Sequence, residues 1–465
     1  MRASNKILSV DFGTTRCKVG VFDERGKVLA HKEGAYAILY SDSGLLEQDD
    51  KEWQATFFGC LSSLNSTAKV GVDMVAITGQ GSTAICLDRE GKVLAPIISH
   101  LDTRPHAYGG KINSGVGNLG YVPSKMLASL LWIKENRPRV FRRLHHVADV
   151  REYLGYLLTG KVTYDSASYS PNILAKSLDL TGLGENVLGE PHDNSSPVGV
   201  LNVQSARRTG MKKGTPVLIA PFDGMCGVVG AGVDKVGLVA DIVGSTEVVS
   251  TPVPTGSPLG IIPHVVKGLS LSYMSPPLGL LYQWFRDEFY GMSDKAFSVM
   301  EEDAISTPAG CGGLLCVPQV RYEGFHSRSA LSFHNFTTSR KRSEMGRAVM
   351  EGIALYVCDA LQKLRNAGME LTQVRIGGGG AQSDLWNQIR ADVYGLEVAV
   401  PQTVETTCLG SAIFAAVALG VYGQFVEACS KMVRPTRFFR PRERNRDSYA
   451  EMYRRFKLAR NAPEE

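Results

Sequence analysis

A pattern of strand, glycine turn and strand occurs twice in this chain, about 230 residues apart. The first copy starts with the mostly apolar residues 7–10, continues through DFGTTRCK and ends in VGVFDERG. The second copy, LVADIVGSTEVVS, starts at Leu238. A period of half the chain implies two related domains, since the repeats of solenoid proteins are only roughly 20–50 residues long.

Helical patterns alternate with strand patterns in both halves. Residues 124–136 and 342–368 have apolar positions at helical spacing, and the second segment ends at a glycine. Strands that interleave with helices favour the α/β class. We expect two domains, residues 1–233 and 234–465, because the chain is too long for one ordinary core. Without a long linker, the two halves are expected to meet across a cleft.

The two glycine turns place hydroxyl groups beside backbone N–H groups, which suits them to phosphate oxygens. An ordinary β-turn is the alternative for either turn taken alone, and the second equivalent turn favours a phosphate clamp. Asp11, just before the first turn, is the expected Mg²⁺ ligand, since this ion binds a carboxylate together with phosphates and waters. The residues predicted to hold phosphate are Gly13, Thr14, Thr15, Gly244, Ser245 and Thr246.

A third glycine turn, GGGGAQSDLWNQ at residues 377–388, follows the strand-like QVRI. Consecutive glycines let a flat ligand or another backbone segment approach closely, so this turn is a candidate ligand site. A tight connection without a ligand is the alternative. Neither GxGxxG nor GxxxxGK[ST] occurs between a strand and a helix, which argues against Rossmann and P-loop nucleotide sites.

Composition narrows the class of protein. The net charge is only +5 and its basic excess lies in residues 434–457, which argues against a broad nucleic-acid surface. The nine cysteines are dispersed without a CxxC pair, as in reduced proteins. Neither a signal peptide nor an apolar run of membrane-spanning length is found. We therefore expect a cytoplasmic protein that acts without nucleic acid or membrane.

Several segments, in order along the chain, resemble the FGGY family of carbohydrate kinases, which has the actin/Hsp70/hexokinase ATPase fold. The two glycine turns match the family's phosphate hairpins. Its sugar-site segment resembles AITGQGSTAICLDREGKVLAPIISHLDTR, its catalytic segment GTPVLIAPFDGMCGVVGAG and its adenosine segment GGGGAQSDLWNQIRADVYGLEVAVP. The resemblance implies an α/β fold of two duplicated actin-like (ribonuclease H-like) domains that flank a cleft for ATP and sugar.

The same resemblance implies a carbohydrate kinase that uses ATP and Mg²⁺ to phosphorylate a sugar hydroxyl. Asp223 is the expected general base, which takes the proton from the attacking hydroxyl. Asp11 is expected to organise the metal. The adenosine pocket is expected to be lined by Gly379, Gly380, Ala381 and Ser383.

The acceptor segment departs from familiar subfamilies. This chain has GQGSTA where xylulokinases usually carry Gln-Met-His-Gly and glycerol kinases carry Asn-Gln-Arg-Glu. Phe222 replaces a glycine that is common just before the catalytic Asp. The residues expected to contact the acceptor are Gln80, Gly81, Ser82, Asp102, Phe222 and Asp223.

We expect the acceptor to be a ketopentose of the xylulose or ribulose type. A polyol such as erythritol and a linear autoinducer-type ketose are the alternatives. Two other classes are a non-catalytic sensor of ATP or sugar and an actin- or Hsp70-like ATPase that acts on proteins. The presence of Asp11 and Asp223 disfavours the sensor, and no insertion for a protein substrate is found. Dimers are frequent in the family, so a homodimer is one expectation for the assembly.

Overall fold

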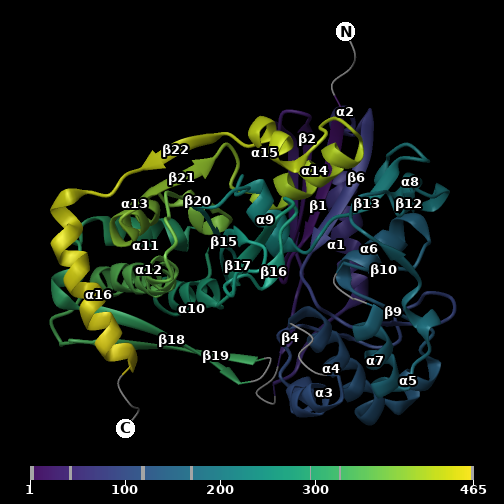
Figure 1. The fold of residues 1–465 in the computed structure, drawn as a ribbon, viewed down its shortest axis with the longest axis horizontal. Helices are drawn as coiled ribbons and strands as arrows, with labels where there is room; N and C mark the ends of the chain where they lie inside the picture. The colour runs from purple at the N-terminus through teal and green to yellow at the C-terminus, as the bar shows by residue number, and fades with distance from the viewer. Residues whose placement is uncertain are drawn as a thin grey trace. The chain divides into compact units, whose positions relative to one another are not determined.

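Each strand–turn–strand segment forms the centre of its own mixed sheet in the computed structural model (Figure 1). The structure describes residues 5–40, 44–116, 121–167, 171–293, 295–323 and 326–461. Strands and helices alternate around both sheets, as the sequence pattern predicts for the α/β class.

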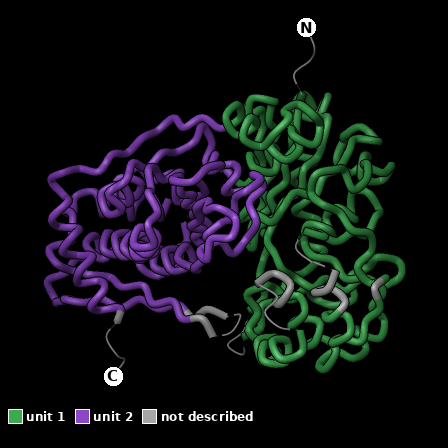
Figure 2. The backbone as a smooth tube through the Cα atoms, in the orientation of Figure 1, with its two compact units in different colours: residues 1–226, 323–326, 407–432 green, residues 227–322, 327–406, 433–465 purple. Residues whose placement is uncertain are grey.

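The chain is divided into two compact units, which are coloured separately in Figure 2. Unit 1 contains the residues up to Cys226 and, in addition, Thr407–Met432. Unit 2 contains Gly227–Tyr322, Ser327–Thr406 and the chain from Val433 on. The chain thus returns to unit 1 late in the sequence. A single domain boundary at residue 233 does not describe this return.

The sheet of unit 1 joins an antiparallel part to a parallel part. Its strands lie in the order β12 (Gly199–Val200), β13 (Pro216–Ile219), β6 (Val72–Gly79), β1 (Lys6–Phe12), β2 (Arg16–Asp23) and β3 (Val28–Ala35). β1, β2 and β3 pair antiparallel, whereas β1, β6 and β13 are parallel. β3 exposes most of its residues, including charged ones, as edge strands commonly do.

The sheet of unit 2 repeats this topology. Its strands lie in the order β16 (Ile262–Pro263), β17 (Leu269–Met274), β15 (Glu247–Pro254), β14 (Leu238–Val243), β20 (Gln373–Gly377), β21 (Glu397–Pro401) and β22 (Pro435–Phe439). β14 pairs antiparallel with β15 and parallel with β20, just as β1 pairs with β2 and β6. The duplication predicted from the two glycine turns is therefore present in the strand order.

Side chains of β1 alternate between the two faces of the sheet, and helices pack against each face. Leu8, Val10 and Phe12 belong to a core cluster that also holds the apolar residues of α1 (Asp50–Ser63) and α6 (Val150–Thr159). Ser9 lies on the opposite face, where it hydrogen-bonds Ser411 of α14 (Thr406–Ala418). Helices therefore cover both faces, and Asp11 shares the face of Ser9 and α14.

The core of unit 2 is built around α12 (Arg342–Asn366), which is buried over most of its length. Four helices pack with it in the same cluster: α10 (Leu278–Tyr290), α11 (Ala296–Ile305), α13 (Asp384–Tyr394) and α16 (Arg446–Asn461). The hairpin of β18 (Leu315–Glu323) and β19 (His326–His334) belongs to this unit apart from its tip. Helix α12 begins and ends within two residues of the segment predicted from the sequence.

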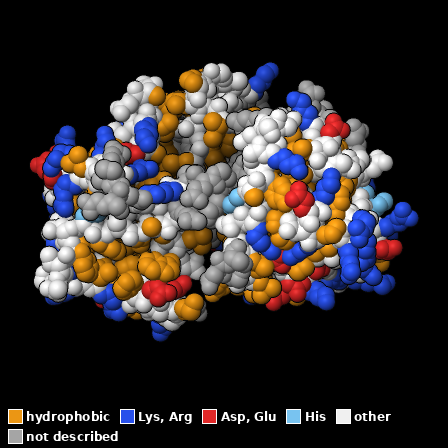
Figure 3. Space-filling model, turned by 90° about the horizontal axis from the view of Figure 1, so that it is seen from below, with side chains coloured by type: hydrophobic (Ala, Val, Ile, Leu, Met, Phe, Trp, Pro, Cys, Tyr) orange, Lys and Arg blue, Asp and Glu red, His pale blue; other side chains and the backbone are white. Residues whose placement is uncertain are grey.

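The surface mixes charged and apolar side chains. On the face drawn in Figure 3, Lys and Arg side chains are interspersed with acidic and hydrophobic ones. No helix in the described ranges is long and apolar enough to cross a membrane. All nine cysteines fall within those ranges, and they are buried and form no disulfide.

Candidate active site

Three predicted site segments follow neighbouring strand ends of unit 1. Asp11 lies near the end of β1, Gln80 follows β6, and Asp223 follows β13. These strands are parallel, so their carboxyl ends meet at one edge of the sheet, where α/β proteins commonly bind ligands. A hydrogen bond of 2.9 Å from Gln80 N to Phe12 O fixes the register there.

Asp223 is the first residue of α9 (Asp223–Gly230) and is half-buried. Its Oδ1 accepts a hydrogen bond of 2.7 Å from Gly224 N. Burial raises its pKa to about 6, and the positive charge of Arg151 opposes this rise. A Cβ on Gly410 of α14 would overlap the Cys226 carbonyl oxygen, so α14 and α9 pack as closely as glycine allows.

Asp11 and Asp223 influence the same two groups. Burial raises the pKa of the Tyr36 hydroxyl above its usual value, and the charges of Cys17, Asp11 and Asp223 raise it further. Burial likewise raises the pKa of the Cys226 thiol, with smaller contributions from both aspartates. Both carboxylates therefore lie near enough to Tyr36 and Cys226 to act on the same two groups.

The backbone carbonyl groups of the first glycine turn accept hydrogen bonds from Tyr36 and Gln48. Tyr36 donates from its hydroxyl to Gly13 O and from its backbone N to Thr15 O. Gln48 Nε2 donates to Thr14 O at 2.8 Å. Three consecutive carbonyl groups are thus fixed by contacts within unit 1, and the turn residues are half-exposed, so their role in phosphate binding stays a prediction.

Buried polar atoms without partners gather in the acceptor segment. Among the residues that the structure describes, Gln80 Oε1, Ser82 Oγ and Thr83 Oγ1 have no hydrogen-bond partner, nor does Asp149 Oδ2. Gln80 is 2% exposed and Ser82 is 1% exposed. Most buried polar groups in proteins are hydrogen-bonded, so these atoms are available to bind a polar ligand.

Both carboxylate oxygens of Asp102 have hydrogen-bond partners within unit 1. Its Oδ1 accepts hydrogen bonds from Arg104 N and Nε at 2.9 and 3.0 Å. Its Oδ2 accepts from Leu46 N at 2.9 Å and from Arg104 Nη2 at 2.7 Å. Both oxygens thus serve contacts within unit 1, and the predicted contact of Asp102 with the acceptor stays a prediction.

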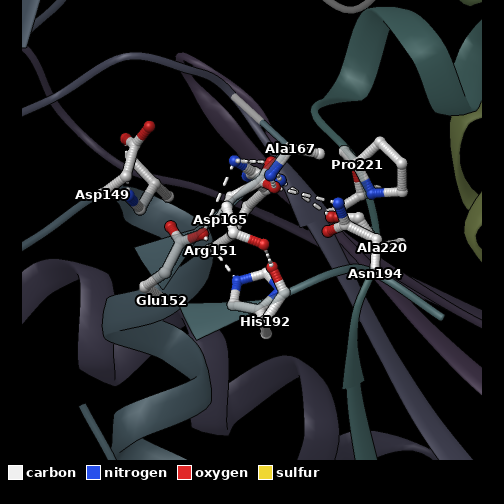
Figure 4. Close-up of polar contacts among 12 residues, drawn as sticks. Asp149, Arg151, Glu152, Asp165, Ala167, His192, Asn194, Ala220 and Pro221 are labelled. Atoms are coloured by element: carbon white, nitrogen blue, oxygen red, sulfur yellow. Dashed lines mark hydrogen bonds and ion pairs between the residues drawn. The ribbon is translucent and has the colours of Figure 1, made fainter. Parts of the chain in front are cut away.

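Two residues near this edge were not singled out by the sequence, Asp149 and Arg151 (Figure 4). Arg151 donates to Ala220 O at 2.9 Å and forms buried ion pairs with Asp165 and Glu152 at 3.4 and 3.5 Å. It therefore holds the turn that leads from β13 to Asp223. In the sequence, these residues are marked only as charged residues at the start of the apolar helix pattern in DVREYLGYLL.

The second glycine turn, in unit 2, is packed against the start of α10. Gly244 N donates to Thr246 O at 3.0 Å, and Leu280 N donates to Ser245 O at 2.9 Å. A Cβ on Gly279 would overlap Gly244 O, so glycine is required where the helix meets the turn. Gly244 is exposed at the tip of the turn, and its role in phosphate binding stays a prediction.

The third glycine turn lies beside the second. Gly378 has a φ of +78°, and a Cβ there would overlap Val243 O, directly before Gly244. Gly380 packs against the Val243 side chain with no room for a Cβ. A Cβ on Gly379 meets no atom within 4 Å among the described residues. Gly379 is exposed and has open space around its Cα.

Ala381 and Ser383, two further predicted adenosine contacts, have partners within unit 2. Ala381 is fully buried, and its carbonyl accepts hydrogen bonds from Asn387 and Arg437. Ser383 caps α13 and donates to Glu301 Oε1 at 2.8 Å. These contacts shape the turn, and a contact of either residue with adenosine stays a prediction.

A buried ion cluster ties the second hairpin to α13. Arg390 lies 3.3 Å from Asp241 and 2.9 Å from Glu247, and all three side chains are inaccessible to solvent. Burial lowers the pKa of Arg390, but Glu247 and Asp241 more than offset it, so the guanidinium stays charged. The cluster fixes the strands on both sides of Gly244–Thr246 relative to the helix after the third turn.

Comparison with models of known protein families shows to which family this chain belongs. The model described as the FGGY family of carbohydrate kinases, N-terminal domain, matches residues 6–230, and the C-terminal domain model matches residues 276–419. The chain belongs to the FGGY family of carbohydrate kinases. It is therefore a carbohydrate kinase, and kinases of this family use ATP.

Similar proteins of the FGGY family match this chain over nearly its whole length. Autoinducer-2 kinase from Enterobacter sp. (strain 638) is 26% identical, with 97% of this chain and 93% of that protein covered. Gluconate kinase from Lactobacillus acidophilus has a TM-score of 0.82 at 19% identity, covering 99% of this chain and 98% of that one. Xylulose kinase from the same organism has a TM-score of 0.81 at 18% identity, covering 98% of both chains. These likenesses confirm the expected α/β fold with two duplicated actin-like domains.

Proposed function

We propose that this FGGY kinase phosphorylates a hydroxyl group of a small ketose, with a ketopentose of the xylulose or ribulose type as the acceptor. The observation that best supports this is the set of unpartnered buried polar atoms in residues 80–83, at the edge of the sheet that bears Asp223. An acceptor with several hydroxyl groups donates to Gln80 Oε1 and exchanges hydrogen bonds with Ser82 Oγ. Gly81 adds no side chain that would occupy the same space.

In the proposed reaction Asp223 is the general base. Its carboxylate accepts the proton of the acceptor hydroxyl as that oxygen attacks the γ-phosphorus of ATP, and the bond to the β–γ bridging oxygen breaks. ADP and the sugar phosphate are the products. A pKa of about 6 leaves most of the carboxylate deprotonated at neutral pH.

The nucleotide is proposed to contact the three glycine turns. Phosphate oxygens accept hydrogen bonds from the residues of the two hairpin turns, and the open space beside Gly379 receives part of the nucleoside. The residues proposed for phosphate are Gly13, Thr14, Thr15, Gly244, Ser245 and Thr246.

Asp11 is proposed to hold Mg²⁺, and its surroundings fit that ion. Within the described ranges no group of three or more His, Cys, Asp or Glu side chains forms a cage for a metal. Mg²⁺ suits such a site because it takes most of its ligands from phosphates and water, with one or two carboxylates. When bound, it neutralises charge on the phosphoryl group during transfer.

A second candidate acceptor is autoinducer-2. The observation that favours it is the full-length match to kinases named for this compound, at 26% identity. The small residues of GQGST also leave this segment without the bulky Met-His pair usual in xylulokinases. Both candidates require the same base and the same unpartnered polar groups, so a comparison of rates distinguishes them.

ADP release measured across an acceptor panel tests the proposal. The panel contains xylulose, ribulose, ketohexoses, erythritol, pentitols and autoinducer-2, and one ketose is expected to give the highest kcat/KM. Asp223→Asn should lower the rate about 10²- to 10⁴-fold while ATP binding, measured by calorimetry, is retained. ADP release that is independent of every acceptor would contradict the kinase proposal and favour an ATPase. ATP binding without turnover on any acceptor would favour a sensor.

A further inference from the structure

Asp149 has one carboxylate oxygen that the fold does not use. The residue is 4% exposed and precedes α6. Its Oδ1 accepts hydrogen bonds from Val150 N at 2.8 Å and from Thr83 N at 2.9 Å. Its Oδ2 has no hydrogen-bond partner in the described part of the chain. A buried carboxylate oxygen without a partner is costly, which indicates that a ligand supplies one.

The unused oxygen borders the acceptor segment. A Cβ built on Gly81 would lie 3.6 Å from Asp149 Oδ2 and 4.0 Å from the Cβ of Phe222, the residue before Asp223. The absent side chain of Gly81 therefore leaves a gap between Asp149 and the catalytic segment. Ser82, the next residue, also has an unpartnered Oγ.

Neighbouring charges within unit 1 do not bring the pKa of Asp149 down to its usual range. Burial and then the charge of Glu152 raise its pKa to about 7, and Arg151 opposes the rise only in part. The Arg151 side chain instead pairs with Asp165 and Glu152, and the carboxylate of Asp149 points away from it (Figure 4). A hydroxyl donor at Oδ2 would stabilise the charged form.

We propose that Asp149 Oδ2 binds a second hydroxyl group of the acceptor, and that Asp149 is a specificity-determining residue of this kinase. The acceptor class is a compound with at least one hydroxyl besides the one that is phosphorylated. This inference rests on the proposed function. It adds Asp149 to the acceptor contacts expected from the sequence, and unlike Asp149, Asp102 has partners on both carboxylate oxygens, from Arg104 and Leu46.

The first test replaces Asp149 without removing the helix cap. Asp149→Asn and Asp149→Ser both keep a capping acceptor for α6, but Asn replaces Oδ2 by an amide nitrogen and Ser removes it. We expect the acceptor KM to rise about 10- to 100-fold in both variants, because a hydrogen bond to a charged group is lost. The ATP KM and the melting temperature should remain close to those of the wild type.

Asp49→Asn is the matched control. Asp49 caps α1 through Lys51 N and is exposed, so this variant makes the same chemical change at a cap outside the site. It should leave both KM values unchanged. Equal shifts of the acceptor KM in the control and in Asp149→Asn would overturn the proposal.

Acceptor analogues that each lack one hydroxyl identify the contact. The wild type should lose affinity when one particular hydroxyl is removed, and the Asp149 variants should no longer distinguish that analogue from the parent compound. An unchanged acceptor KM in Asp149→Ser overturns the proposal while leaving the kinase function intact. A parallel loss of acceptor affinity, ATP affinity and melting temperature also overturns it, because that pattern indicates a structural role. A wild-type enzyme that phosphorylates no ketose or polyol overturns both the proposed function and this inference.

Discussion

At Asp223, the raised pKa sets the lower limit of the working pH range. Burial raises this pKa to about 6, and a general base accepts a proton only when it is deprotonated. We expect kcat, at saturating ATP and acceptor, to fall about tenfold per pH unit below this pKa and to level off above it. Rates measured between about pH 5 and pH 8 check this. A rate that stays constant down to pH 5 would exclude Asp223 as the base.

Arg151 should affect both stability and the pH profile. Arg151→Met removes the buried guanidinium that pairs with Asp165 and Glu152, so the free energy of unfolding should fall by about 3–5 kcal/mol. The positive charge of Arg151 lowers the pKa of Asp223, so its removal should move the midpoint of the kcat profile to higher pH. Urea unfolding and pH–rate profiles measure the two effects.

Arg151→Lys is the control for that experiment. Lysine keeps the positive charge but loses the planar fork that reaches Asp165 and Ala220 O together. The variant should keep the wild-type pH midpoint and lose part of the stability. A midpoint that does not move in Arg151→Met would show that Arg151 acts on Asp223 through packing alone.

The two aspartates Asp102 and Asp149 show what local sequence patterns can and cannot predict about a site. Asp223 and Asp11 were predictable because each follows or ends a strand beside a short motif. The partners of Asp102 include Leu46 N, which lies far away in the sequence, so its full set of contacts could not be predicted from a local pattern. Asp149 resembles any helix cap until its second oxygen is found without a partner.

At the scale of elements, the contact between α14 and α9 requires glycine. A Cβ on Gly410 would overlap the Cys226 carbonyl, so Gly410→Ala should lower the free energy of unfolding by about 1–3 kcal/mol. Gly59→Ala in α1 is the matched control, since Gly59 is exposed and a Cβ there meets no described atom within 4 Å. This control should raise the free energy of unfolding by about 0.5–1 kcal/mol. Urea unfolding measures both free energies. If they change in the same direction in the two variants, the packing explanation is wrong.

The third glycine turn offers a similar contrast for nucleotide binding. Gly379→Ala places a methyl group in open space, so the melting temperature should not change, whereas the ATP KM should rise by at least about fivefold through a clash costing on the order of 1 kcal/mol. Gly380→Ala, which would overlap Val243, should instead lower the melting temperature. A wild-type ATP KM in Gly379→Ala would show that the nucleotide does not use this space.

The architecture was more predictable from the sequence than the details of the site. The glycine turns and the strands around them are local patterns, and their repetition predicted the shared topology of the two sheets. The close approaches at Gly279 and Gly410 depend on which helix lies opposite, and no pattern within either segment contains that information. Ser383 likewise combines a predictable helix cap with a bond to the distant Glu301.

At the scale of the whole molecule, unit 1 is completed by a segment from late in the chain. Thr407–Met432 supplies Ser411, which bonds Ser9, and Tyr422, which bonds Glu24 O at 2.5 Å. We therefore expect a fragment of residues 1–233 to unfold without a cooperative transition. The same fragment joined through a flexible linker to residues 407–432 should regain one. Thermal unfolding followed by circular dichroism compares them, and equal cooperativity in both fragments would contradict the structural role of the returning segment.

The late position of residues 407–432 also determines when unit 1 can be completed during synthesis. Residues emerge at about 5–20 per second, so roughly 10–40 s separate the synthesis of Cys226 from that of Met432. During this interval the face of β1 that bears Ser9 and Asp11 lacks its α14 partner. That face gains its α14 cover only after residues 407–432 have been made, so the sheet edge that bears Asp11 is among the last regions of unit 1 to be completed.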